Sequence, residues 1–193
     1  SWTINGETVS GDGPTLTGGF RDDDIIGCTV TPSDGEDTGE PVSAEIVVSN
    51  TPPTIESAAV TPTDPSYSDT LTCSWFGYFD DDGDEDASLP RWFKGDGEYL
   101  GRGETLSDAF VGGDSVYCVV TPYDGKDPGA SVTSDPVIVE NTAPTLASTV
   151  LTPLEATVED VMICEPGETT DPDGTSSFSY TYRWEVSGLL YFE

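Results

Sequence analysis

Short runs of apolar, β-branched and aromatic residues recur along the chain, separated by turn residues. Three clear runs lie at 70–75, 115–120 and 136–139. In the second run Val116, Cys118 and Val120 occupy alternate positions, which places them on one face of a strand. No segment shows the period of a helix, and 21 Gly and 15 Pro interrupt the chain. We therefore expect an all-β protein of short antiparallel strands.

The pattern repeats about every 90 residues. Its landmarks are three tryptophans, Trp2, Trp92 and Trp184. The stretch that begins at Cys28 (Cys-Thr-Val-Thr-Pro-Ser-Asp-Gly) returns at Cys118 as Cys-Val-Val-Thr-Pro-Tyr-Asp-Gly. The linker at 50–54, Asn-Thr-Pro-Pro-Thr, returns at 141–145 as Asn-Thr-Ala-Pro-Thr. A period of this length is typical of a tandem array of one small domain, in which the tryptophans would be core residues.

The repeat predicts the domain organisation. We expect residues 1–50 to be the C-terminal half of one repeat, residues 51–141 to be a complete repeat, and residues 142–193 to be the N-terminal half of a third. A sequence that starts and stops inside a repeat suggests a window on a longer stalk or fibre. The question then becomes what the chain holds together.

The chain is strongly acidic. It has 37 Asp and Glu against 6 Lys and Arg, no His, and a net charge of −31. This surface repels nucleic acid and anionic membranes, and it attracts cations. No run approaches the roughly 20 apolar residues that a membrane-spanning helix needs, so we expect no membrane span. A coat of solvated acidic residues is the simplest interpretation of the bulk charge.

The four cysteines follow the repeat. Cys73 and Cys118 lie in the complete repeat, Cys28 is equivalent to Cys118, and Cys164 is equivalent to Cys73. We expect a Cys73–Cys118 disulfide, with Cys28 and Cys164 paired outside this sequence or with each other between two copies. Disulfides indicate an oxidising, extracellular compartment. The alternative is four reduced, buried thiols. With neither CxxC nor His, we expect no metal-binding or redox role for the cysteines.

The order Cys73, Trp92, Cys118 resembles that of immunoglobulin domains. The stretch Asp171-Pro-Asp-Gly…Tyr180-Thr-Tyr-Arg-Trp184 is similar to a stretch found in bacterial surface repeats. The chain thus resembles the tandem Ig-like or PKD-like repeats of large secreted bacterial proteins. The resemblance implies tandem immunoglobulin-like antiparallel β-sandwiches with a period of about 90 residues. It also implies an extracellular, cell-surface structural module.

Acidic turns carry the strongest chemical signal. Six of the seven residues at 80–86 are carboxylates, and 171–174 is the counterpart one repeat later. A second acidic turn lies at 34–37 and again at 124–127. A hard cation such as Ca²⁺ relieves such repulsion and takes six to eight oxygens from a flexible loop. The predicted ligands are Asp80, Asp82, Asp84, Asp86, Asp124, Asp127, Asp171 and Asp173.

The alternative is that these residues are solvated turns, since Asp-Gly favours a turn without any metal. This applies most to Asp34 and Asp124. In an immunoglobulin-type sandwich, however, the loops after the second and sixth strands lie at one end. The linker at 50–53, the loop at 80–86 and the turn at 124–127 should therefore converge, and Ca²⁺ there would stiffen the junction. Asn141 would play the same part beside Asp171 and Asp173.

No catalytic arrangement is evident. Without His, a Ser-His-Asp or Cys-His arrangement cannot form within this chain, and the paired carboxylates lie in turns, so we expect no enzyme. The leading interpretation is a structural repeat unit of a secreted bacterial surface fibre or filament, whose partners are copies of itself or adjacent repeats. The alternatives are the stalk of a large adhesin, or an accessory module of a secreted hydrolase. The module would bind surface glycans through Phe93, Tyr99 or Tyr191.

Overall fold

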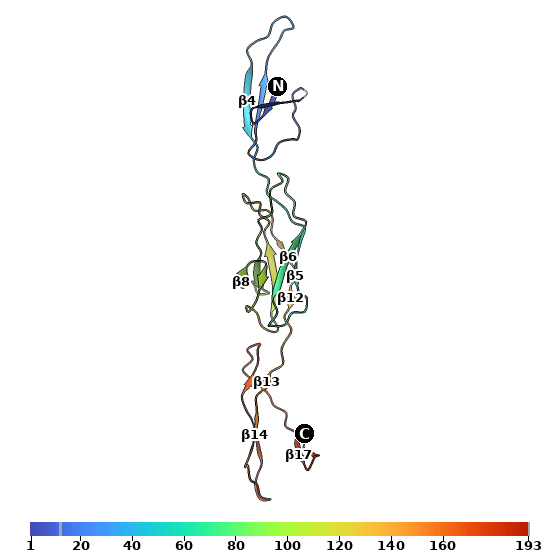
Figure 1. Ribbon diagram of the computed structural model, residues 1–193, viewed down its shortest axis with the longest axis vertical. Helices are drawn as coiled ribbons and strands as arrows, with labels where there is room; N and C mark the ends of the chain where they lie inside the picture. Colours follow the sequence, from blue (N-terminus) through green and yellow to red (C-terminus); the bar gives the residue numbers. More distant parts are fainter. Residues whose placement is uncertain (12, 193) are drawn as a thin grey trace. The chain divides into compact units, whose positions relative to one another are not determined.

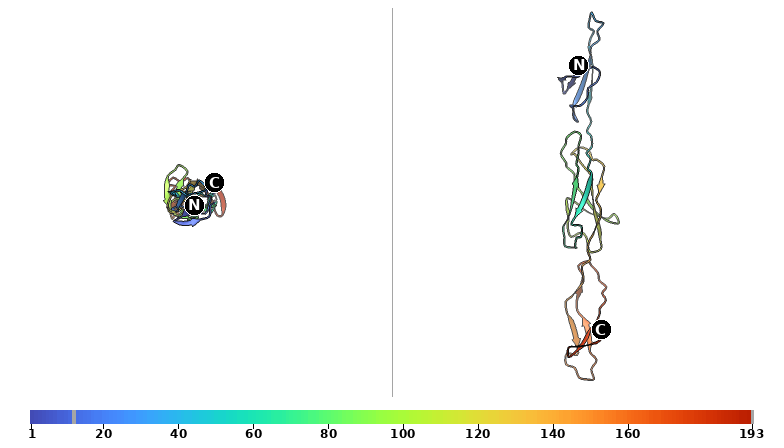
Figure 2. Two further views of the ribbon diagram at one scale, coloured as in Figure 1. Left: turned by 90° about the horizontal axis from the view of Figure 1, so that it is seen from above. Right: turned by 90° about the vertical axis from the view of Figure 1, so that its right-hand side faces the viewer.

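The computed structural model describes residues 1–11 and 13–192, with the side chains of residues 191 and 192 left aside. All the regular secondary structure in these residues is β-strand (Figures 1 and 2), so the all-β prediction is confirmed. None of the described residues forms the long apolar helix that a membrane span requires. The chain divides into two compact units. The first comprises residues 1–58, 74–90 and 119–134, and the second comprises residues 59–73, 91–118 and 135–193.

We name three segments after the predicted repeat boundaries: N-terminal (1–50), central (51–141) and C-terminal (142–193). The N-terminal segment forms one antiparallel sheet in the order β2-β1-β3-β4. Its strands are β1 (Trp2–Ile4), β2 (Glu7–Val9), β3 (Ile25–Val30) and β4 (Val42–Val47). Asn5 and Gly6 both have positive φ, 51° and 84°, which is the two-residue hairpin turn that Asn-Gly favours.

The central segment contains two sheets. One has the order β5-β6-β9, and the other has the order β11-β10-β7-β8, with β12 also paired to β10. The strands are β5 (Ser57–Thr61), β6 (Leu71–Phe76), β7 (Arg91–Lys94), β8 (Tyr99–Arg102), β9 (Thr105–Leu106), β10 (Ser115–Val120), β11 (Val132–Thr133) and β12 (Val137–Ile138). The runs predicted at 70–75, 115–120 and 136–139 correspond to β6, β10 and β12.

The disulfide Cys73–Cys118 joins the two sheets of the central segment, as predicted, because it links β6 to β10. Around it in the second unit, Leu71, Trp92 and Val116 are completely buried. The Trp92 Nε1–H donates to the carbonyl oxygen of Gly103 at 2.8 Å, so the indole is buried without an unsatisfied polar group. Each such large apolar side chain contributes about 1.5–3 kcal/mol on burial.

The C-terminal segment consists of short two-stranded pairs. These are β13 (Thr145–Leu146) with β16 (Thr169–Thr170), β14 (Thr149–Thr152) with β15 (Ile163–Pro166), and β17 (Trp184–Val186) with β18 (Leu189–Phe192). Trp184 is half-buried, as is Trp2 in the N-terminal segment, whereas Trp92 is completely buried. The prediction that the repeated tryptophans are core residues is therefore confirmed for Trp92, whereas Trp2 and Trp184 are only half-buried.

Candidate functional site

Asp82 ties together segments of chain that are distant in sequence. It lies in the loop after β6 and is 9% exposed. Its Oδ1 accepts the backbone N–H of Asp22 at 3.2 Å, and its Oδ2 accepts the backbone N–H of Thr51 at 2.7 Å. Hydrogen bonds to an ionised acceptor are about twice as strong as neutral ones. One carboxylate thus holds residue 22 of the N-terminal segment, the linker and the loop at 80–86, all within the first unit.

The second unit contains the same arrangement. Asp173, 91 positions after Asp82, accepts the backbone N–H of Gly112 at 2.7 Å and that of Thr142 at 2.5 Å. Gly112 and Thr142 lie 90 and 91 positions after Asp22 and Thr51. We call each arrangement, Asp82 with Asp22 and Thr51 or Asp173 with Gly112 and Thr142, an aspartate clamp. The clamp therefore occurs twice, at equivalent positions.

A preceding aspartate shapes the turn that presents each clamp. Asp80 Oδ1 accepts the backbone N–H of Asp82 at 2.9 Å, and Asp171 Oδ1 accepts that of Asp173 at 2.8 Å. An aspartate that bonds the backbone two residues later is a standard turn former. Both turns then place a glycine at φ 83°, Gly83 and Gly174, where a Cβ would be strained. The sequence Asp-x-Asp-Gly thus specifies the clamp locally.

A second polar contact holds the same linker in the first unit. The Asn50 side-chain amide donates to Asp124 at 2.9 Å and to Asp127 at 3.0 Å. Asp124 also accepts two backbone N–H groups of its own turn, those of Lys126 at 2.7 Å and Asp127 at 2.6 Å. Burial alone raises the pKa of Asp124, but these hydrogen bonds outweigh it and leave the pKa below its ordinary value. The linker, the loop at 80–86 and the turn at 124–127 therefore meet.

Lys126 supplies positive charge at this meeting point. Its ammonium forms ion pairs with Asp22 and, at 2.9 Å, with Asp84. These hydrogen bonds raise the pKa of Lys126 above its ordinary value, so it is charged throughout the physiological range. The equivalent position in the N-terminal segment is Glu36. A lysine at this position is therefore not present in every repeat.

Three buried polar atoms near the first clamp have no hydrogen-bond partner: Asn50 Oδ1, Asp80 Oδ2 and Tyr78 Oη. Burial raises the pKa of Tyr78 to about 12, with smaller contributions from the negative charges of Asp80, Asp86 and Asp124. The site thus concentrates negative potential, and two of its unpartnered oxygens, Asn50 Oδ1 and Asp80 Oδ2, are of the kind that a cation could use.

The predicted metal ligands are mostly engaged in other contacts. Asp82 and Asp173 form the clamps. Asp80, Asp124 and Asp171 hold their own turns, and Asp127 bonds Asn50. Asp84 pairs with Lys126, and Asp86 accepts Trp75 Nε1–H at 2.7 Å. Over the described ranges, no three Asp, Glu, Cys or His side chains come together as a metal-binding group. These contacts match those expected of acidic turns better than those of a preformed metal site.

The substitution Tyr78→Phe should make the free energy of unfolding of the first unit less sensitive to alkaline pH. The Tyr78 hydroxyl is buried without a partner, so its removal should leave the free energy of unfolding unchanged or slightly higher at pH 7. Because the folded pKa of about 12 exceeds the ordinary value near 10, Tyr78 ionises first in the unfolded chain, and the free energy of unfolding is independent of this group below about pH 10. The free energy of unfolding then falls as the pH rises from about 10 to 12.

Thermal melts across this range, with tyrosinate absorbance followed in parallel, measure the effect. Tyr78→Phe should flatten the alkaline decline, whereas Tyr67→Phe is the matched control at another tyrosine. Equal declines in wild type and Tyr78→Phe would contradict the assignment.

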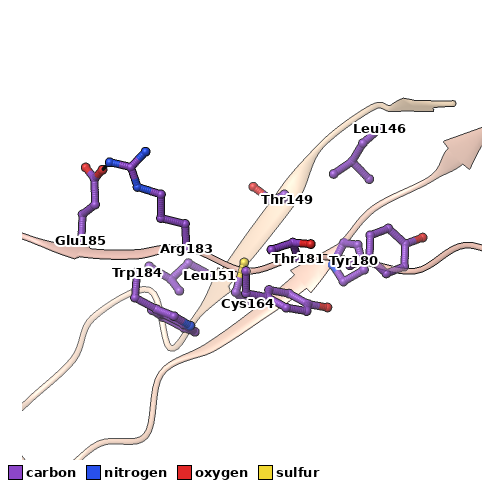
Figure 3. A pocket seen from close by; sticks show the side chains of 11 residues that line it. Leu146, Thr149, Leu151, Cys164, Tyr180, Thr181, Arg183, Trp184 and Glu185 are labelled. Carbon is purple, nitrogen blue, oxygen red and sulfur yellow. Dashed lines mark ion pairs between the residues drawn. The ribbon is translucent and has the colours of Figure 1, made fainter. Parts of the chain in front are cut away.

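Cys28 and Cys164 are free thiols in the structure, and both are half-buried. Cys164 lines a hollow of about 440 Å³ in the C-terminal segment, together with Leu146, Leu151 and Trp184 (Figure 3). Leu146 and Leu151 are 44% and 47% exposed.

Their counterparts in the central segment, Ile55 and Val60, are 8% and 5% exposed. The hollow is therefore lined by apolar side chains whose counterparts in the central segment are buried.

Of the aromatic residues suggested for glycan binding, Phe93 and Tyr99 contact each other on neighbouring strands, with ring centroids 5.7 Å apart. Tyr99 is 54% exposed. The side chain of Tyr191 lies outside the described residues. No protein-family model matches the chain, and no curated protein matches it in sequence.

Proposed function

We propose that the chain is a structural repeat unit of a secreted bacterial surface fibre, built from tandem immunoglobulin-like sandwiches joined in series. The observation that carries this proposal is the twofold occurrence of the aspartate clamp, at Asp82 and at Asp173. A binding or catalytic site is generally built once. A contact that recurs with the period of the sequence serves something that also recurs, and here that is the joint between repeats.

Each clamp restrains a joint that would otherwise be a free linker. It binds a residue before the joint, Asp22 or Gly112, and a linker residue, Thr51 or Thr142. Hydrogen bonds to charged groups contribute about 1.5–3 kcal/mol each. Proline in the linkers adds stiffness. Restrained joints suit a protein whose task is to hold a distance or transmit a pull.

The remaining features support an extracellular location. The Cys73–Cys118 disulfide is stable in oxidising compartments. The net charge of −31 keeps a repetitive protein soluble and discourages non-specific association. We place the protein at the cell surface, with copies of itself or adjacent repeats as partners and with no enzymatic activity.

Calcium is a proposed addition to the first joint. The orphaned oxygens of Asp80 and Asn50 are the carboxylate and amide donors that Ca²⁺ takes, with carbonyls and water completing its shell. These two residues would hold the ion, and its charge would offset the carboxylates around Tyr78. Lys126 already neutralises Asp22 and Asp84, so calcium would act beside the lysine bridge.

Electron microscopy of the purified, oxidised 193-residue chain tests both parts of the proposal. In Ca²⁺ we expect continuous filaments, and in excess chelator we expect looser filaments with more variable bends. Addition of Mg²⁺ alone is the control, because its strict octahedral geometry suits this flexible site poorly. Filaments that look the same with and without chelator would contradict the calcium proposal but would leave the structural role standing. Separate particles in every condition would favour an adhesin stalk or an accessory module.

A further inference from the structure

Three aromatic rings form a row across neighbouring strands in the second unit. Phe93 on β7 lies edge-on to Tyr99 on β8, with centroids 5.7 Å apart and planes at 65°. On its other side Phe93 stacks on Tyr117 of β10, at 5.7 Å and 20°. Trp92, which precedes Phe93, is completely buried. Since successive side chains of a strand point to opposite faces, the row lies on the outer face of the sheet.

Two arginines share this outer face. Arg91 lies two residues before Phe93 on β7, and Arg102 is its direct register partner on β8. Both are exposed. Arg102 and Tyr99 are three positions apart, which in a regular strand would place them on opposite faces. The register shift between Trp92 and Phe93 absorbs one extra residue of β8, and a bulge of this kind re-aims side chains. The bulge therefore brings Tyr99 and Arg102 to the same side.

The two arginines are anomalous in this chain. Only 6 residues are basic and 37 are acidic, yet no ion pair formed within the described part of the chain includes Arg91 or Arg102. Like charges directly opposite each other on paired strands are destabilising. Nearby Lys94, by contrast, is neutralised by Asp114 at 2.9 Å. Folding alone gives no reason to keep two unpaired guanidinium groups side by side.

The other segments show that the fold does not need this arrangement. Arg183 is the counterpart of Arg91, and it pairs at 2.7 Å with Glu185, which stands where the central segment has Phe93. In the N-terminal segment the positions of Phe93 and Tyr117 are Thr3 and Gly27. The central segment thus has aromatic rings where its neighbours have small or acidic residues, and its arginine has lost the acidic partner.

We propose that this aromatic–arginine face, formed by Arg91, Phe93, Tyr99, Arg102 and Tyr117, binds an acidic polysaccharide rich in uronate sugars. A guanidinium matches a carboxylate with two parallel hydrogen bonds. Rigid aromatic rings offer a broad surface on which the apolar faces of sugar rings pack. The exposed ring of Tyr99 and the two guanidinium groups supply both kinds of contact on one face.

A polysaccharide fits this face better than an acidic turn from a second copy. Such a turn would satisfy the guanidinium groups but would leave the aromatic row uncovered. The overall charge of −31 repels either partner at long range. The Debye length is about 8 Å at physiological ionic strength, so the local arginines govern contact there. The proposal does not depend on the fibre role, because an array with or without filaments can carry this face.

Titration of polygalacturonate into the oxidised 193-residue chain, followed by calorimetry at physiological ionic strength, tests the proposal. We expect saturable binding to polygalacturonate and none to neutral dextran. Arg91→Gln and Arg102→Gln should each weaken binding about tenfold or more, and Tyr99→Ala should weaken it several-fold. Arg183→Gln is the matched control, because this arginine occupies the equivalent position beside Glu185, and it should bind as wild type does.

Three outcomes would overturn the proposal. The first is absence of binding to polygalacturonate, and the second is equal weakening by Arg183→Gln. The third is self-association in analytical ultracentrifugation, without polysaccharide, that Arg91→Gln abolishes, since this would assign the face to a second copy. The exposed substitutions should leave the fold intact, which near-ultraviolet circular dichroism verifies. Loss of glycan binding leaves the filament experiment unaffected, so failure of either proposal can be told from failure of the other.

Discussion

Replacing Cys73 and Cys118 together by alanine should lower the free energy of unfolding of the central segment by about 4 kcal/mol. The bond closes a loop with a sequence separation of 45 residues, and an open loop of that size gives the unfolded chain much more conformational freedom. The loss is large beside the 5–15 kcal/mol that typically stabilises a domain. Urea unfolding followed by tryptophan fluorescence measures it, because Trp92 reports on the same core.

The matched control is the double variant Cys28→Ser and Cys164→Ser. Both thiols are free in the structure, so this variant should unfold at the urea concentration of wild type. Thiol labelling under native conditions should likewise modify these two cysteines and leave the other two intact. A loss below about 1 kcal/mol on removing Cys73 and Cys118 would show that the disulfide contributes little to the core.

Alanine at position 82 should open the first aspartate clamp. Two charge-assisted hydrogen bonds are lost, and the backbone N–H groups of Asp22 and Thr51 lose their acceptor. We expect the local opening free energy to fall by about 3 kcal/mol, which corresponds to roughly 100-fold faster exchange of these two amide protons. Hydrogen exchange followed by NMR measures each amide separately.

Asp81→Ala is the control for charge and loop composition, because Asp81 is exposed and precedes Asp82 in the same loop. The amide protons of Gly112 and Thr142, held by Asp173 in the second unit, provide an internal reference and should exchange as in wild type. If Asp81→Ala accelerates exchange at Thr51 as much as Asp82→Ala does, the clamp is not what protects that amide.

Local pattern sufficed to predict the strands β6, β10 and β12 and the disulfide. The alternation of Val116, Cys118 and Val120 indicates a strand with one buried face, and the structure buries these three side chains completely in β10. The pairing of Cys73 with Cys118 follows from the position of each cysteine within the repeat. Both inferences rest on short-range periodicity or on sequence equivalence, and neither needs knowledge of how distant segments approach.

The role of Asp82 could not be read from its surroundings. Its partners are backbone N–H groups 60 and 31 residues away, and backbone groups leave no trace in composition. Six carboxylates in one loop suggest a metal instead. The usable signal was comparison of the two copies: Asp80 and Asp82 persist as Asp171 and Asp173, whereas Asp84 and Asp86 become Thr175 and Ser177. The two retained positions are the ones that form the turn and the clamp.

The grouping of residues in the aromatic–arginine face also could not be predicted from the sequence. Phe93 and Tyr99 can be picked out as aromatic residues, but their grouping with Arg102 depends on the bulge in β8. A regular two-residue period places Tyr99 and Arg102 on opposite faces. Bulges are set by the pairing of two strands, so a single-strand pattern does not reveal them. The extent to which each repeated tryptophan is buried could not be predicted either, since burial of Trp92 depends on the other sheet.

Backbone ¹⁵N relaxation of the 193-residue chain tests the central claim most directly, because it reports whether the three segments tumble together or separately. If the clamps restrain the joints, one anisotropic rotational diffusion tensor should fit the rigid amides of residues 1–50, 51–141 and 142–193. The double variant Asp82→Ala and Asp173→Ala should then require a separate correlation time for each segment. Separate correlation times already in the wild-type chain, unchanged by the double substitution, would contradict the account.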